Sequence, residues 1–152
     1  MHLATYLGLV DDGEATLAAS FRQVADGHQR ETDVVHLCER FAVQCDSHRE
    51  QLAPVVARYG EECPQEPERL HAQGLDGTRT GGVGLLRDLH DLYLLVSYLD
   101  IAWTVVGQAA KAVRDRELLA VVTWCERETS AQLSWLTTRM KEAAPQALVV
   151  AD

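Results

Sequence analysis

Hydrophobic residues recur at intervals of three and four along most of this chain, and almost no stretch alternates with a period of two. That spacing is typical of amphipathic α-helices. It predicts four helices, at residues 3–27, 32–59, 84–113 and 115–143. Gly27 and Gly60 are the expected stops of the first two helices. Thr32 or Asp33 is the expected N-cap of the second helix, and Asp115 that of the fourth.

Residues 61–83 interrupt this periodicity with a polar stretch that contains two prolines and several glycines. A connection of this length can run back along a helix of about 40 Å. The chain then reads as two helix pairs, each closed by a short turn, with a long crossover between helices 2 and 3. We therefore expect an all-α, antiparallel four-helix bundle that forms one domain over residues 1–152. Pro54 should kink the second helix or mark its early end.

Composition and charge narrow the classes of function. The chain is 47% hydrophobic and carries a formal net charge of −9, which argues against binding to nucleic acid or to an anionic membrane surface. Its four cysteines form no CxxC pair, so neither a zinc ribbon nor a thioredoxin-like motif is predicted. Reduced thiols and the lack of a basic, apolar leader favour a cytoplasmic location.

The third predicted helix is apolar on several faces. Its stretch LYLLVSYLDIAWTVVGQAA, residues 92–110, carries one charge, Asp100, and approaches the length of a membrane span. An intramembrane aspartate is costly, and the other three helices need an apolar partner, so we expect a buried central helix and no membrane insertion. Apolar surface left over on this helix predicts a homodimer formed through it.

Four polar residues fall on the predicted core-facing stripes: Glu14, Cys45, His48 and Asp100. Buried polar groups need partners, so one interpretation is a hydrogen-bonded cluster of His48 with Glu14 or Asp100. The other is a single metal ion, because thiolate and imidazole together suit Zn²⁺. The pattern indicates no nucleophile and no nucleotide motif.

With its two helix pairs and long crossover, the chain resembles the ferritin-like superfamily. Its di-iron members carry a Glu on helix 1, Glu-x-x-His on helix 2, a Glu on helix 3 and Glu-x-x-His on helix 4. The resemblance assigns Glu14, His48 and Asp100 to three of these ligand positions, while Cys45 stands where the bridging Glu belongs. Helix 4 offers Glu128 without the following histidine. Two iron ions need several carboxylates, so this departure predicts no working di-iron centre.

Two functions follow as expectations. The first is a ferritin-like structural or binding module without enzymatic chemistry. The alternative is a metal-binding protein, related to iron oxidation or storage or holding one Zn or Fe ion. Its candidate ligands are Glu14, Cys45, His48, Asp100 and Glu128. No substrate or small-molecule ligand is predicted for either function.

Overall fold

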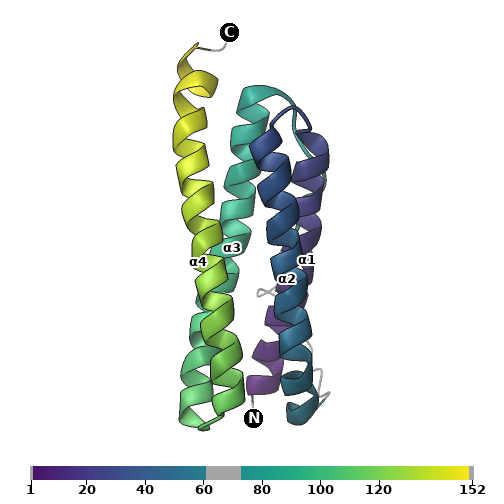
Figure 1. Cartoon of the computed structure of the whole chain (residues 1–152), viewed down its shortest axis with the longest axis vertical. Coiled ribbons are helices and arrows are strands. Elements are labelled where there is room, and N and C mark those ends of the chain that lie inside the picture. Colours follow the sequence, from purple (N-terminus) through teal and green to yellow (C-terminus); the bar gives the residue numbers. More distant parts are fainter. Residues whose placement is uncertain (1, 61–72, 151–152) are drawn as a thin grey trace.

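A computed structural model describes residues 2–60 and 73–150, and within these ranges every regular element is helical. Long helices lie side by side along the molecule (Figure 1). Their bounds are α1 Leu3–Gly27, α2 Thr32–Tyr59, α3 Gly81–Ala112 and α4 Arg116–Pro145, and a short π-helix, η1 Gln146–Val150, continues α4. The predicted all-α four-helix architecture is confirmed.

Contacts at the two ends of the molecule fix the direction of each helix. His28, directly after α1, bonds to Asp88 near the start of α3, so these helices run antiparallel. Tyr59 at the end of α2 bonds to Asp115 at the start of α4, while Arg139 near the end of α4 reaches the beginning of α2. The neighbouring pairs are α1 with α2, α3 with α4, α1 with α3, and α2 with α4. Each helix is therefore antiparallel to both neighbours, and α2 runs parallel to α3 across the diagonal.

Most of the predicted helix ends agree with the structure. The Asp115 side chain accepts a hydrogen bond from the Leu118 amide at 3.0 Å, which confirms it as the N-cap of α4. Gly60 ends α2 with a φ of +83°, a left-handed conformation that glycine adopts at little cost.

Two details of the predicted helix ends are wrong, and one of the two alternatives for Pro54 is excluded. The residue that caps α2 is Glu31, with no side-chain cap bond, rather than Thr32 or Asp33. Helix α2 continues through Pro54 to Tyr59, so the alternative of an early end there is excluded. Helix α3 begins at Gly81, three residues before the predicted start, because the backbone turns at this glycine, whose φ is +76°.

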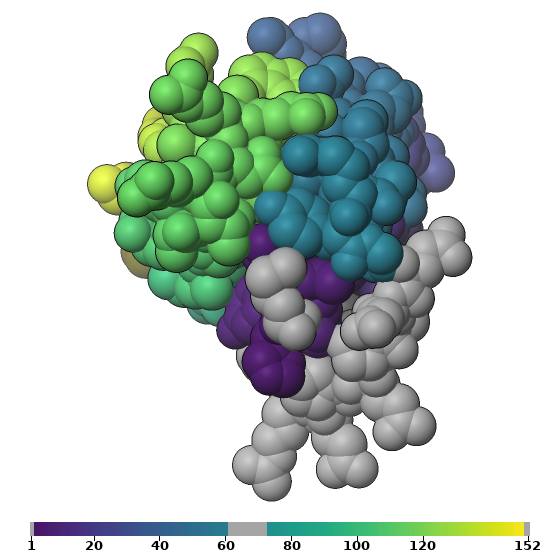
Figure 2. Space-filling model, turned by 90° about the horizontal axis from the view of Figure 1, so that it is seen from below, coloured from purple at the N-terminus to yellow at the C-terminus, as the bar shows by residue number. Residues whose placement is uncertain are grey.

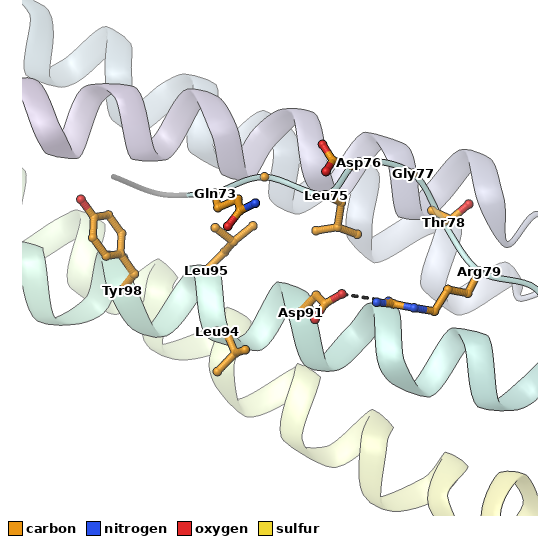
Figure 3. Close-up of a pocket in the computed structure, with 11 residues that line it drawn as sticks. Gln73, Leu75, Asp76, Gly77, Thr78, Arg79, Asp91, Leu94, Leu95 and Tyr98 are labelled. Atoms are coloured by element: carbon orange, nitrogen blue, oxygen red, sulfur yellow. Dashed lines mark hydrogen bonds and ion pairs between the residues drawn. The ribbon is translucent and has the colours of Figure 1, made fainter. Parts of the chain in front are cut away.

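The first part of the predicted crossover, residues 61–72, lies outside the described residues. Residues 73–80, the strap, lead into α3 and run along α1 (Figure 3). The Leu75 amide donates to Ser20 Oγ at 3.3 Å, and Thr78 packs against Gly27, where even a Cβ atom would clash. The strap therefore closes one side of the bundle between α1 and α3.

Helix α3 is only partly covered by the other helices. Its inward side is fully buried and includes Trp103, whereas Leu94 and Ile101 are each 59% exposed and Val105 is 41% exposed. By length and composition α3 could cross a membrane. Of its most apolar 18-residue stretch, 44% is buried inside the bundle. The exposed residues Leu94, Ile101 and Val105 share one side of the helix and are called the α3 stripe below.

Candidate functional site

The Glu14 carboxylate lies at the centre of the bundle and is 1% exposed. Its Oε1 atom accepts one hydrogen bond from Trp103 Nε1 at 2.8 Å and a second from His48 Nδ1 at 3.0 Å. A buried carboxylate is costly unless it is paired and hydrogen-bonded. These bonds join α1, α2 and α3 at one level, so the predicted pairing of His48 with Glu14 is confirmed.

The imidazole of His48 is fully buried and held on several sides. Because Nδ1 donates to Glu14, the Nε2 atom points the other way, toward α4. It lies 3.5 Å from Glu128 Oε1, within ion-pair range but too far for a hydrogen bond, and it has no other protein partner. The ring also meets Trp103 and Trp124 edge to face, with centroid distances of 6.2 and 5.4 Å. The geometry leaves one nitrogen of a rigidly held histidine beside a carboxylate that is 18% exposed.

Cys45 lies one helical turn before His48 and belongs to the same buried group. Burial raises the pKa of the Cys45 thiol well above its usual range, and the adjacent negative charge of Glu14 raises it further. The thiol is therefore the expected form at neutral pH, and a thiolate ligand or nucleophile is disfavoured at this position.

Asp100 does not join this cluster, so the prediction that it faces the core is wrong. Trp103 is the α3 residue that reaches Glu14, with an exposed fraction of 0%, whereas Asp100 is half-buried. At about 100° per residue, positions three apart differ by roughly 60° around the helix. The core accepts only the tryptophan side of that arc, and the Trp103 indole N–H donates to Glu14, a bond that the sequence does not predict.

The structure thus brings together Glu14, Cys45, His48 and Glu128 from the predicted ligand set. Within the described ranges, however, no three His, Cys, Asp or Glu side chains are grouped so that they could hold a metal ion. The arrangement can hold a charge in a fixed position and can accept a cation at His48 Nε2. One atom supports that possibility, because His48 Nε2 is buried and has no protein hydrogen-bond partner.

A second buried polar cluster lies at the end of the bundle where α3 begins, and sequence reasoning missed it. Asp88 is 0% exposed and accepts from His28 Nε2 at 2.7 Å, from the Arg79 amide at 2.9 Å and from the Arg79 guanidinium at 2.7 Å. Arg79 also pairs with Asp91 at 2.8 Å (Figure 3). Every charge here has a partner, so the cluster fastens the strap to α1 and α3. The only signal in the sequence was Asp88 itself, an aspartate at helical spacing from apolar residues of α3.

The strap and α3 enclose a shallow pocket of about 650 Å³, the one drawn in Figure 3. Leu75 and Leu95 give it an apolar floor, while Asp76, Asp91 and Arg79 give it a polar edge. Because Arg79, the basic residue of this lining, is already paired with Asp88 and Asp91, the pocket offers no positive charge that is free to bind an anionic ligand. It is a weaker candidate for function than the cluster around Glu14.

Comparisons with known proteins add no relative: no family model matches the chain, and no match was found among curated proteins or solved structures.

Proposed function

We propose that this chain is a ferritin-like helical bundle without a di-iron centre, which acts as a structural or binding module and works as a homodimer. The observation that carries this proposal is the α3 stripe. Leu94 and Ile101 are each 59% exposed in the middle of the most apolar helix, seven residues apart on the same side. Covering such a stripe with a second α3 removes apolar surface from water, which is the main driving force of association.

The antiparallel order of the helices and the parallel run of α2 and α3 support the ferritin-like relationship. The buried cluster around Glu14 supports the absence of di-iron chemistry. Its carboxylate is engaged by Trp103 and His48, Asp100 lies outside it, and Cys45 favours the neutral thiol. In such a module the cluster fixes the register of α1, α2 and α3, because sliding any of these helices would leave a buried charge without a partner.

Sedimentation equilibrium of the wild-type chain and of Ile101→Asp tests the dimer. A charge in the centre of the α3 stripe should convert a wild-type dimer into a monomer. Val43→Asp is the matched control, because Val43 is also 59% exposed but lies on α2. A monomeric wild-type chain over the micromolar range, or equal effects of the two substitutions, would contradict the proposal.

A second candidate function is the binding of one Zn or Fe ion, and the unpartnered His48 Nε2 favours it. Two ligands about 2.1 Å from a tetrahedral ion lie about 3.4 Å apart. The separation of 3.5 Å between His48 Nε2 and Glu128 Oε1 fits this value. Histidine ligands commonly donate their other nitrogen to a carboxylate, as His48 does to Glu14. Water would have to complete the coordination.

Elemental analysis of untagged protein, purified without a chelator, tests this candidate. One equivalent of Zn or Fe per chain should be present in the wild type and lost in both His48→Ala and Glu128→Ala. Metal that is absent from the wild type, or that both variants retain, would exclude the site. A cytoplasmic location stays a prediction, supported by three buried cysteines, Cys38, Cys45 and Cys125, that form no disulfide.

A further inference from the structure

The last described residues of the chain form an apolar surface that no other described part of the same copy covers. Within η1, Ala147 is 4% exposed and lies beside Gly82 at the start of α3. The next three residues, Leu148, Val149 and Val150, are 64%, 81% and 63% exposed. Three consecutive exposed aliphatic side chains on an ordered helical turn cost free energy in water and are typical of a contact surface. These three residues are called the tail below.

An apolar groove of about 280 Å³ lies at the other end of the bundle, between the start of α1 and the end of α3. Figure 2 looks at this end of the molecule, where the purple start of α1 lies beside the green elements. The lining of the groove is aliphatic apart from the rings of His2 and Tyr6, and includes Leu3, Val105, Ala109, Ala112 and Val113. The volume suits a few aliphatic side chains and falls below the usual range for a drug-sized ligand.

The tail and the groove cannot meet within one copy. Gly82, beside the tail, and Ala109, in the groove, lie near opposite ends of the same helix, about 40 Å apart at 1.5 Å per residue. Figure 1 shows the start of α1 and the end of α4 at opposite ends of the bundle. Any contact between the tail and the groove must therefore join two molecules.

We propose that the tail of one copy occupies the groove of a second copy. The two surfaces match in polarity and in size, since the tail offers three aliphatic side chains and the groove holds about that number. Lys111 is exposed next to the groove, and Glu142, which follows the exposed Lys141, is exposed shortly before the tail, so Lys111 of one copy can pair with Glu142 of the next. Complementary charges at the rim favour one orientation of docking over others.

This contact is heterologous, because each copy contributes a different surface. Repeated from copy to copy, it extends into a chain or closes into a ring. The contact goes beyond the pairing of α3 helices proposed above and does not require it. Val105 both lines the groove and belongs to the α3 stripe.

The test uses two single substitutions and their mixture in sedimentation equilibrium. Val149→Asp should disable the tail, and Ala112→Asp should disable the groove. Both sites are exposed, so both chains should fold, and Ala112→Gln replaces the second variant if circular dichroism shows otherwise. To isolate the contact, both are made in the Ile101→Asp background. Each should lower the association constant at least about tenfold, equivalent to 1.4 kcal/mol.

The mixture gives the decisive result. A Val149→Asp chain keeps its groove and an Ala112→Asp chain keeps its tail, so equimolar amounts should form a one-to-one complex that neither forms alone. Failure of the mixture to associate, or undiminished association of Val149→Asp, would overturn the proposal.

If Ile101→Asp alone abolishes all association, the α3 stripe is the only interface and the tail contact is wrong. If Ile101→Asp has no effect while Val149→Asp does, the tail contact holds and the α3 pairing is wrong. A monomeric wild type whose binding to phosphatidylcholine vesicles depends on Val149 would replace the second copy with a lipid surface.

Discussion

Replacing His48 with alanine tests the energetics of the buried cluster. The substitution removes one of the two hydrogen-bond donors of a carboxylate that is 1% exposed, and it empties the space of a fully buried ring. Leaving a buried charged group without one of its partners costs about 3–5 kcal/mol. For a domain of this size, each kcal/mol lowers the melting temperature by roughly 2–4 °C, so the expected decrease is roughly 6–20 °C.

A double-mutant cycle separates the pair from the packing around it. If Glu14 and His48 are both replaced by leucine, this cluster no longer buries the Glu14 charge. Such replacements often leave the free energy of unfolding nearly unchanged. The Trp103 N–H then loses its acceptor, at a cost of about 1–3 kcal/mol. The double variant should therefore be more stable than the sum of the two single leucine variants predicts.

Urea unfolding followed by circular dichroism measures both effects. His36→Ala is the matched control on α2, because that histidine is exposed and should change stability by at most about 0.5 kcal/mol. A loss below about 1 kcal/mol for His48→Ala, or strictly additive effects in the cycle, would refute the idea that His48 stabilises the buried Glu14 side chain.

Three further predictions concern local packing and titration. On α1, Gly8→Ala should raise stability by about 0.5–1 kcal/mol, since nothing lies near its Cβ position. Gly13→Ala should not raise it, because the new Cβ would lie 2.8 Å from a Leu99 methyl group; equal effects of the two in urea unfolding would contradict this. Hydrogen bonds from the Leu118 amide and the Tyr59 hydroxyl lower the pKa of Asp115, so its contribution to stability is present above the unfolded pKa near 4 and is lost as the pH falls through the folded value. Asp115→Ala should cost about 1 kcal/mol at pH 7 and flatten that acid dependence of the unfolding free energy. Burial raises the pKa of the Cys38 thiol to about 12, so a Cys63→Ser chain should react with Ellman's reagent at pH 8 only as fast as it unfolds, and a rapid phase would show an accessible thiol.

The hydrophobic pattern predicted the helices well because each amphipathic stripe is repeated over seven or more turns, and an error at one position changes little. Glu14 and His48 were found for the same reason, since both lie in the middle of their stripes. The burial of Asp100 was predicted wrongly because Asp100 and Trp103 lie three residues apart, about 60° around the same side of α3. Only packing against α1 decides which of the two is buried. Sequence periodicity carries no information about that choice.

The cluster at Asp88 shows a different limit. Its partners are His28, in a turn 60 residues before Asp88, and Arg79, in the strap nine residues before it, and neither segment has helical periodicity. An aspartate in an apolar stripe can be a solvated edge residue or a buried anchor, and the difference depends on where two irregular segments pass. Only the three-dimensional path of the chain brings these groups together.

The distribution of the Glu14 cluster over the helices has a consequence for the folding rate. Glu14 and His48 belong to the α1–α2 hairpin, whereas Trp103 belongs to the α3–α4 hairpin. Each hairpin joins helices that are adjacent in sequence, and such local contacts form early. The Glu14 carboxylate then stays hydrated until the α3–α4 hairpin docks and the Trp103 indole replaces the water bound to it. We therefore expect docking to be the slow step, so Trp103→Phe should slow refolding, whereas a change confined to one hairpin, such as Gly8→Ala, should leave the docking step unchanged.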